Sequence, residues 1–433
     1  MYMRDMLRKR EAEDVAAAAV AVAIPLWPAA VPVLLIALVL AVAWGHFRSG
    51  AGLCHPSWST SLPWMAGFYI LHVIGLGWSS NMDLGMFDLQ VKLPLLVFPV
   101  LLWLGARSSF DPAPVSVTFV RACVLAVVVD LVRSTWTIGS MALARNGPLP
   151  SAYTLSKALF GEGFSPHLHP SYFAMYLTFA LGLVAFGTAF RGWGGRTRWG
   201  LALVLVIGVV LSASKAGWIL ALALGVGVLI VHRNERRWRR WGGLAIIAGG
   251  LVSALSYARV EFVHERIAQV LGTVHEAGPD PHASNSTDLR RLVWQAAEQL
   301  VRAHPIIGVG TGDVKDALQQ VYVERDYTGA AERHLNAHSQ YLNSWVALGL
   351  AAPLLLLFSC WIPLIVAFRR RESVAGIFFL LNGLNWTVEA MLEVQAGVVF
   401  FAFFSWLLVL DRSHGDRSAN FAAHDPVQPS PHR

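Results

Sequence analysis

The chain turns from polar to apolar within residues 333–350, whose sequence is RHLNAHSQYLNSWVALGL. Its first part carries charged and amide side chains, and its second part continues without a break into an apolar stretch. A histidine, His338, is thereby placed at the rim of a predicted membrane span. A polar side chain at this depth costs free energy, so it usually serves a function. Because an imidazole changes charge near neutral pH, it can take a proton from an alcohol.

The composition of the whole chain indicates a membrane protein. Of its 433 residues, 55% are hydrophobic and 14% are charged, whereas soluble domains carry roughly a quarter charged residues. In lipid, backbone polar groups must be hydrogen-bonded within the protein, so apolar runs predict helices. The sequence lacks the alternating strands of about 10 residues that a membrane barrel needs. We therefore expect an all-α polytopic membrane protein.

Apolar runs of roughly 20 residues predict about twelve transmembrane helices. We place them near residues 13–27, 29–46, 62–78, 92–105, 115–138, 170–190, 198–212, 215–231, 242–257, 341–367, 374–391 and 395–411. With twelve spans, every arginine-rich cluster falls on one side, which the positive-inside rule assigns to the cytoplasm. Both termini then lie in the cytoplasm. The net charge of +7 reflects this asymmetry and does not indicate nucleic-acid binding.

This topology divides the chain into four parts. Residues 1–257 hold transmembrane helices one to nine, and residues 258–340 form a helical domain outside the cytoplasm. Residues 341–411 hold the last three transmembrane helices, and residues 412–433 form a cytoplasmic tail. From about Ser413 the polar composition of this tail predicts disorder.

The extracytoplasmic domain carries one candidate anion site. Ser284–Asp288 predicts the start of an amphipathic helix. Arg290 lies in its first turn, where an anion would meet both free backbone N–H groups and a guanidinium. Arg291 could take the same role, and a solvated arginine is the plain alternative. The glycine-rich run 306–313 lacks the Lys-Ser/Thr ending of a phosphate loop, so we expect a close-packed turn there.

Lys215 lies in a short turn, Leu211–Gly217, which the topology places on the same membrane face as Arg290 and His338. It is one of only five lysines in the chain, and a lysine that extends to the membrane surface is the alternative interpretation. Two cations and one base suit a substrate with a phosphorylated leaving group and a nucleophilic hydroxyl. The cations would stabilise charge on the departing phosphate, and the imidazole would accept the proton.

Further polar residues lie in or beside the predicted spans. Asp130 and Arg133, three residues apart, are expected to form a structural ion pair. For the His-Leu-His run at 167–169 we favour a role in starting the sixth span over contact with sugar or phosphate. Glu389 and Glu393 flank the last extracytoplasmic turn. They could bind sugar hydroxyls, balance the cations, or simply be solvated.

These segments resemble the O-antigen ligase and O-antigen polymerase superfamily. The tract around His338 and the turn that holds Lys215 are similar to its motifs. The spacing from Arg290 to Trp294, followed by HPIIGVG at 304–310, resembles the run in its large periplasmic loop. These motifs occur in the order that the family shows.

The resemblance covers roughly residues 160–411 and has two departures. Ser339 stands where the superfamily often has asparagine, so the group that orients the imidazole stays open. Lys215 stands where arginine is common. A lysine keeps the positive charge but cannot form the bidentate hydrogen bonds that arginine makes to phosphate.

The resemblance implies a GT-C-like fold with one large periplasmic loop. It implies transfer of O-antigen glycan from undecaprenyl pyrophosphate to a hydroxyl of lipid A–core oligosaccharide, at the periplasmic face of the bacterial inner membrane. The transfer would invert the anomeric centre and need no metal or cofactor. His338 would be the general base, and Arg290 with Lys215 would bind the pyrophosphate. We expect a monomer in the lipid membrane, without a nucleic-acid partner.

Three alternatives stay open. An O-antigen polymerase and a protein O-oligosaccharyltransferase share this donor chemistry and differ in the acceptor. A lipid-linked glycan transporter belongs to a different class and predicts inverted repeats with broken helices near mid-bilayer. The polar signals in this sequence gather at one face instead.

Overall fold

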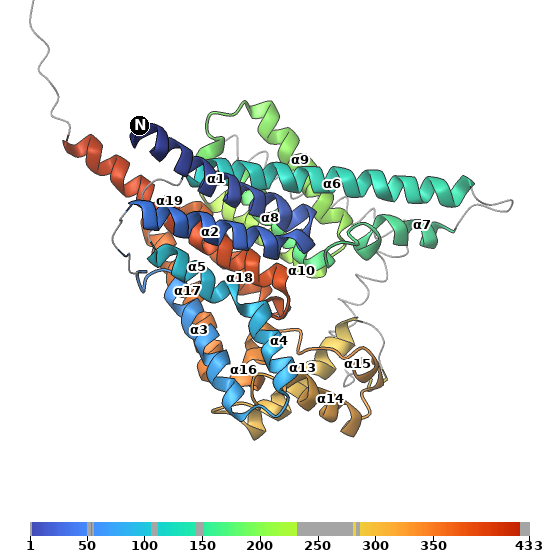
Figure 1. Cartoon of the computed structure of the whole chain (residues 1–433). Helices are drawn as coiled ribbons and strands as arrows, with labels where there is room; N and C mark the ends of the chain where they lie inside the picture. The colour runs from blue at the N-terminus through green and yellow to red at the C-terminus, as the bar shows by residue number, and fades with distance from the viewer. Residues whose placement is uncertain are drawn as a thin grey trace, which may run out of the picture.

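The computed structural model describes residues 2–49, 53, 56–104, 111–143, 151–231, 280–282 and 286–424. Every regular element within these residues is a helix, which confirms the all-α prediction (Figure 1). Several helices begin at a proline, whose missing N–H is not needed in the first helical turn.

The first half of the chain forms the helices α1 to α10. They are α1 (Tyr2–Leu26), α2 (Val31–Ser49), α3 (Leu62–Gly75), α4 (Met82–Lys92), α5 (Pro94–Trp103), α6 (Pro112–Leu143), α7 (Ala152–Leu159), α8 (Pro170–Phe186), α9 (Gly195–Leu211) and α10 (Lys215–Val231).

The second half forms the helices α13 to α19. They are α13 (Ser286–Ala303), α14 (Val314–Glu324), α15 (Thr328–Glu332), α16 (Gln340–Leu348), α17 (Ala351–Arg370), α18 (Ser373–Asn385) and α19 (Gln395–His424). Of these, α13, α14 and α15, which fall in the predicted extracytoplasmic domain, are called the extramembrane helices. Two short 3-10 turns matter for the site, η3 (Gly161–Gly163) and η6 (Met391–Glu393).

The helix lengths agree with a membrane protein. Among the described residues, three helical segments are long and apolar enough to cross a bilayer: Pro28–Arg48, α6 and α17. The pair α4 and α5, bent by 41°, makes a fourth if it is counted as one span. Shorter apolar helices cover Leu62–Trp78, Pro170–Phe186, Lys215–Leu229, Ser373–Asn385 and Gln395–Asp411. The count of twelve spans and the GT-C-like arrangement stay predictions, and the expected span 242–257 lies outside the described residues.

Two predicted boundaries are wrong. The expected span 341–367 is two helices, α16 and α17, because Gly349 has a φ of 67°. Glycine adopts this left-handed region readily, and a helix stops there. The last helix, α19, continues to His424. The polar residues after Ser413, which we expected to be disordered, are therefore helical up to that point.

Aromatic rings hold the later membrane helices to α6. The ring of Phe179 in α8 lies 5.0 Å from that of Phe378 in α18 and 4.9 Å from that of Phe404 in α19. Phe119 of α6 lies 4.6 Å from Phe404. All four side chains are buried, and their edge-to-face contacts add to the stabilisation from burial.

The extramembrane helices α13, α14 and α15 pack at one end of the molecule, beside α4 and α16 (Figure 1). The glycine-rich turn 306–313 joins them to α16. The backbone N–H groups of Val309 and Gly310 donate to carbonyls of α16 at 2.8 and 2.9 Å. A side chain at Gly308, where φ is 68°, would overlap the backbone of α16. This confirms the prediction of a close-packed turn in place of a phosphate loop.

The other side of the same turn holds α3 and α4. The Thr311 hydroxyl donates to the carbonyl of His72 at 2.7 Å. The carboxylate of Asp313 accepts from the backbone N–H groups of Ser80 at 2.8 Å and Asn81 at 2.7 Å. The turn therefore connects the extramembrane domain to three helices at once.

Candidate active site

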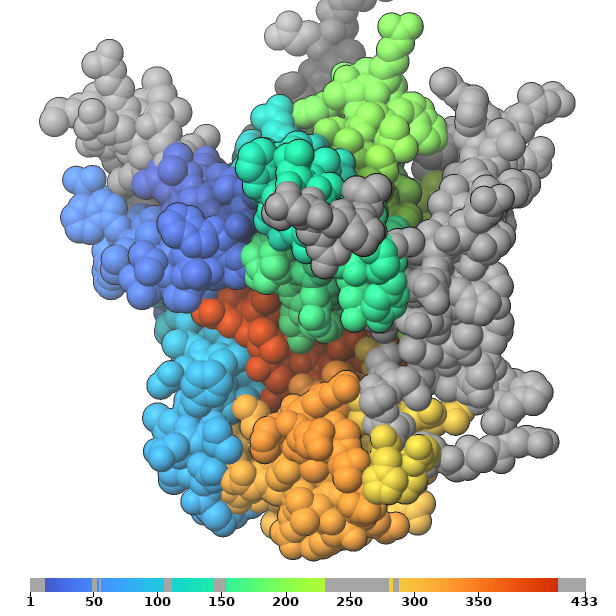
Figure 2. Space-filling view, turned by 90° about the vertical axis from the view of Figure 1, so that its right-hand side faces the viewer, coloured from blue at the N-terminus to red at the C-terminus, as the bar shows by residue number. Residues whose placement is uncertain are grey.

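A cavity of about 620 Å³ lies between the membrane helices and the extramembrane domain. The space-filling view shows C-terminal residues (red) in the hollow between the orange extramembrane helices and the green helices above them (Figure 2). Lys215, Arg290 and His338 all line this cavity. The structure thus brings together the three residues that the sequence predicts for the site, and their roles stay predictions.

His338 reaches the cavity from the segment that precedes α16. Its backbone has a φ of 43°, and its N–H donates to the side-chain oxygen of Asn336 at 2.9 Å. Ser339 caps α16 by accepting from the backbone N–H of Leu342 at 3.5 Å. The Nδ1 atom of His338 lies 3.7 Å from Oε2 of Glu389. The imidazole is therefore held at a helix start with a carboxylate beside it.

Glu389 is the centre of the polar contacts in the site. Only 4% of it is exposed, so the interpretation of a solvated residue is wrong. Its Oε1 accepts from Nη2 of Arg290 at 2.6 Å and from the Ser171 hydroxyl at 3.1 Å. Burial alone would raise the pKa of the Glu389 carboxyl, but His338 and the Arg290 guanidinium outweigh it and hold this pKa below its usual 4.5.

Two hydroxyls connect the turn of Lys215 to this carboxylate. The hydroxyl of Ser214 donates to that of Ser171 at 3.3 Å and accepts from the backbone N–H of Gly217 at 3.1 Å. Ser171 in turn donates to Glu389. Lys215 begins α10 directly after Ser214. The turn that carries this lysine is therefore tied to the carboxylate that holds Arg290.

Positive charge predominates in the part of the cavity lining that the structure describes. Four cationic side chains face two carboxylates: Lys157, Lys215, Arg290 and Arg333 against Glu162 and Glu389. Such an excess attracts an anionic ligand, for example a pyrophosphate. Arg291 is not among the lining residues, so Arg290 is the arginine of this pair that meets the cavity.

The other polar residues lie beside the site. Asp130 and Arg133 form the expected ion pair at 3.8 Å. Asp130 also has Nδ1 of His167 at 3.5 Å, a second partner that the sequence did not predict. His169 accepts from a backbone N–H at the start of α8 at 3.4 Å and also lines the cavity. This confirms the predicted role of His169 in starting the helix.

No group of three or more His, Cys, Asp or Glu side chains able to hold a metal ion occurs among the described residues. The contacts that do occur suit proton transfer. A carboxylate beside Nδ1 favours the imidazole tautomer that carries its proton there and keeps a lone pair on Nε2. Arg290 meanwhile presents further N–H donors beyond the one that Glu389 accepts. The imidazole of His338 and the guanidinium of Arg290 thus both lie beside one carboxylate, that of Glu389.

The lowered pKa of Glu389 predicts a pH-dependent stability. Because the folded protein favours the ionised form, this form stabilises the fold above pH 4.5, and the stabilisation is lost as the pH falls through the folded pKa. The Glu389→Gln variant should therefore melt below the wild type at pH 7, and the difference should shrink in acid. Thermal melts of both proteins in micelles across this range measure it. A difference that stays constant in acid would contradict the assignment.

Part of the chain is similar to a known protein family. Residues 200–358, less than half of the chain, match a family model described as O-Antigen ligase. The matched segment includes Lys215, Arg290 and His338 but ends before Glu389. No curated protein matches the chain. The resemblance that the motifs predict is confirmed over residues 200–358, which are similar to the O-antigen ligase family.

Proposed function

We propose that this protein transfers O-antigen glycan from undecaprenyl pyrophosphate to a hydroxyl of lipid A–core oligosaccharide. The family match supports a glycosyltransferase of the ligase or polymerase type. The proposed location is the periplasmic face of the bacterial inner membrane, with both termini in the cytoplasm, as the loop charges predict.

One observation carries the proposal: Lys215, Arg290 and His338 line one cavity although they lie far apart in the chain. Two of them meet at Glu389, which contacts Arg290 at 2.6 Å and His338 at 3.7 Å. A base and a fixed cation held on one carboxylate suit a reaction in which a hydroxyl loses a proton while a phosphate leaves.

The proposed step is a direct displacement. The acceptor oxygen forms a bond to the anomeric carbon, and its proton passes to Nε2 of His338. The bond from the anomeric carbon to the pyrophosphate oxygen breaks, and the electron pair leaves with undecaprenyl pyrophosphate. Arg290 and Lys215 stabilise the charge that grows on this leaving group. Attack from the opposite side inverts the anomeric centre, and no metal is needed in this scheme.

Reconstitution tests the proposal. Purified protein in proteoliposomes would receive undecaprenyl-pyrophosphate-linked glycan and lipid A–core, with a chelator in a parallel sample. We expect a glycosylated lipid A–core product, visible as a slower band on a gel, with and without chelator. Absence of this product in the presence of both substrates would contradict the ligase assignment.

The same assay separates the alternatives. Growth of the lipid-linked glycan without lipid A–core would indicate a polymerase, and glycan on an added protein acceptor would indicate an O-oligosaccharyltransferase. Movement of the lipid-linked glycan across the vesicle membrane without transfer would indicate a transporter.

A further inference from the structure

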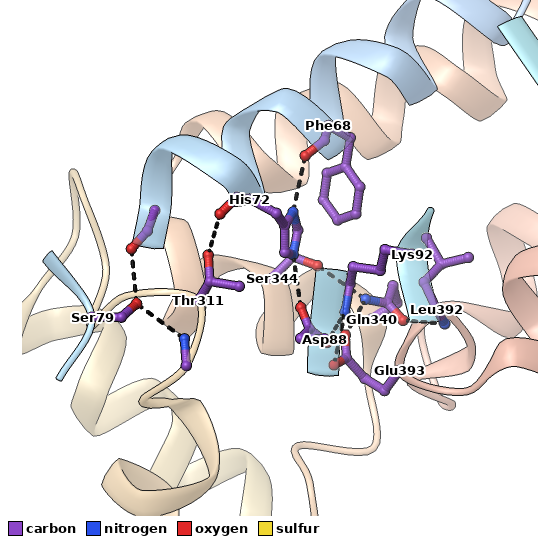
Figure 3. Close-up of polar contacts among 12 residues, drawn as sticks. Phe68, His72, Ser79, Asp88, Lys92, Thr311, Gln340, Ser344, Leu392 and Glu393 are labelled. Atoms are coloured by element: carbon purple, nitrogen blue, oxygen red, sulfur yellow. Dashed lines mark hydrogen bonds and ion pairs between the residues drawn. The ribbon is translucent and has the colours of Figure 1, made fainter. Parts of the chain in front are cut away.

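A second polar network lies away from the cavity, where α4 meets η6 (Figure 3). Its centre is Lys92, which is fully buried. The Nζ atom of Lys92 lies 2.5 Å from Oδ1 of Asp88 and 3.1 Å from Oε2 of Glu393. His72 lies beside them, with its Nε2 3.9 Å from Oδ2 of Asp88. One buried cation thus holds two carboxylates that would otherwise be uncompensated.

Glu393 also contacts the first residue of α16, Gln340. Its Oε1 accepts from Nε2 of Gln340 at 3.0 Å, and the Gln340 side-chain oxygen accepts from the backbone N–H of Leu392 at 2.6 Å. The backbone N–H of Gln340 donates to the carbonyl of Trp386 at 2.8 Å. Gln340, itself fully buried, therefore joins the first residue of α16 to both ends of the segment 386–393.

These two joined segments carry the proposed base and its carboxylate. His338 lies two residues before Gln340, and Glu389 lies within 386–393. The 3.7 Å separation of their side chains depends on the register between the segments. His338 also has a φ of 43°, a left-handed backbone conformation that is strained for a non-glycine residue and persists only where the surrounding structure determines it.

We propose that Lys92 is a positioning residue for His338 and Glu389, an inference that rests on the proposed function of that pair. Lys92 holds Glu393, Glu393 and Leu392 hold Gln340, and Gln340 sets where His338 meets Glu389. Lys92 itself does not line the cavity and touches no substrate.

The test compares two identical substitutions. Lys92→Met removes the buried charge. Lys315→Met removes an exposed lysine near the same helix, since its Nζ lies 6.0 Å from the ring of Phe87 in α4. We expect kcat of Lys92→Met to fall by about tenfold with KM for the donor little changed, since small misplacements of reacting groups cost rate. Lys315→Met should keep both constants.

Two further variants keep the test independent of how well Lys92→Met folds. Gln340→Met breaks the same chain of contacts without unpairing Lys92, and it should lower kcat in the same way. The double variant Lys92→Met with Glu393→Gln removes one of the two carboxylates that Lys92→Met leaves uncompensated, the one that contacts Gln340, and should recover part of the rate. A wild-type kcat in Gln340→Met, or a double variant no faster than Lys92→Met, would overturn the proposal.

A second measurement separates this inference from the proposed function. The rate at which diethyl pyrocarbonate modifies His338, followed by mass spectrometry, reports the placement of the ring without any glycan. We expect this rate to change several-fold in Lys92→Met and Gln340→Met and to stay the same in Lys315→Met. An unchanged rate of His338 modification in both variants would contradict the positioning role of Lys92. A wild-type protein that transfers no glycan would contradict only the proposed function.

Discussion

The His338→Ala variant is expected to transfer glycan about a thousandfold more slowly than the wild type, because a positioned general base contributes roughly 10²–10⁴-fold. The imidazole lines the cavity with Nδ1 toward Glu389, and alanine offers no proton acceptor in its place. Binding of undecaprenyl pyrophosphate should change little, since the side chains of Arg290 and Lys215 remain. The measurement is the initial rate in proteoliposomes together with the affinity for the lipid pyrophosphate.

His334→Ala is the matched control. His334 has a φ of 48° and His338 a φ of 43°, so alanine meets a similar backbone conformation at both positions. His334 is exposed and does not line the cavity. It should transfer glycan at the wild-type rate. Equal losses in the two variants would assign the effect to the backbone and remove the base role from His338.

Arg290→Ala should lose about 10²–10³-fold in kcat/KM, the range observed when one stabilising donor is removed from a developing negative charge. The substitution also leaves Glu389 without its 2.6 Å partner, so the carboxylate loses the cation that opposes its burial. Both consequences act on the site, and both should appear as a weaker affinity for undecaprenyl pyrophosphate together with a lower kcat.

The neighbouring arginine provides the control for this prediction. Arg291→Ala removes the same charge from the same turn of α13, but Arg291 does not line the cavity. It should keep kcat/KM within about threefold of the wild type, because the guanidinium of Arg290 remains in the cavity. The kcat/KM of Arg290→Lys should lie between those of the wild type and Arg290→Ala, since lysine keeps the charge but lacks the planar guanidinium. A larger loss in Arg291→Ala than in Arg290→Ala would reverse the assignment.

The convergence of the three site residues could be predicted from the sequence because topology and motif order carry that information. Loop charges predict one membrane face for Lys215, Arg290 and His338, and the family motifs lie within the matched segment. Which arginine meets the cavity could not be read from spacing, since Arg290 and Arg291 differ by one step around a helix. Only the packing of α13 separates them.

The carboxylates show where sequence reasoning stopped. Glu389 was singled out, but its burial depends on α8 and α13 closing over the turn before η6, which no local pattern records. Lys92 is not among the candidate residues from the sequence, because it stands at the start of the predicted span 92–105. In the structure Lys92 is the last residue of a separate helix, α4, which lies between the predicted spans 62–78 and 92–105. A lysine that begins an apolar run in a chain with five lysines is the signal that could have found it.

Helix boundaries were predicted least well, for a simple reason. Residues 341–367 are apolar nearly throughout, and hydropathy cannot detect the break at Gly349, which depends on backbone conformation. For the tail the prediction missed helix where the span 341–367 had too much of it. Polar residues after Ser413 continue the helix that begins at Gln395. Hydropathy reports where a helix meets lipid and not where it ends.

The glycine-rich turn has a mechanical consequence for the whole enzyme. Val309 and Gly310 are bonded to the far end of the helix that starts just after His338, and Gly308 leaves no gap that could absorb a shift. A displacement of the extramembrane domain would therefore be expected to move α16, whose first residue, Gln340, lies two positions after His338. In the proposed reaction, a glycan that binds to this domain would therefore influence the position of the base through α16.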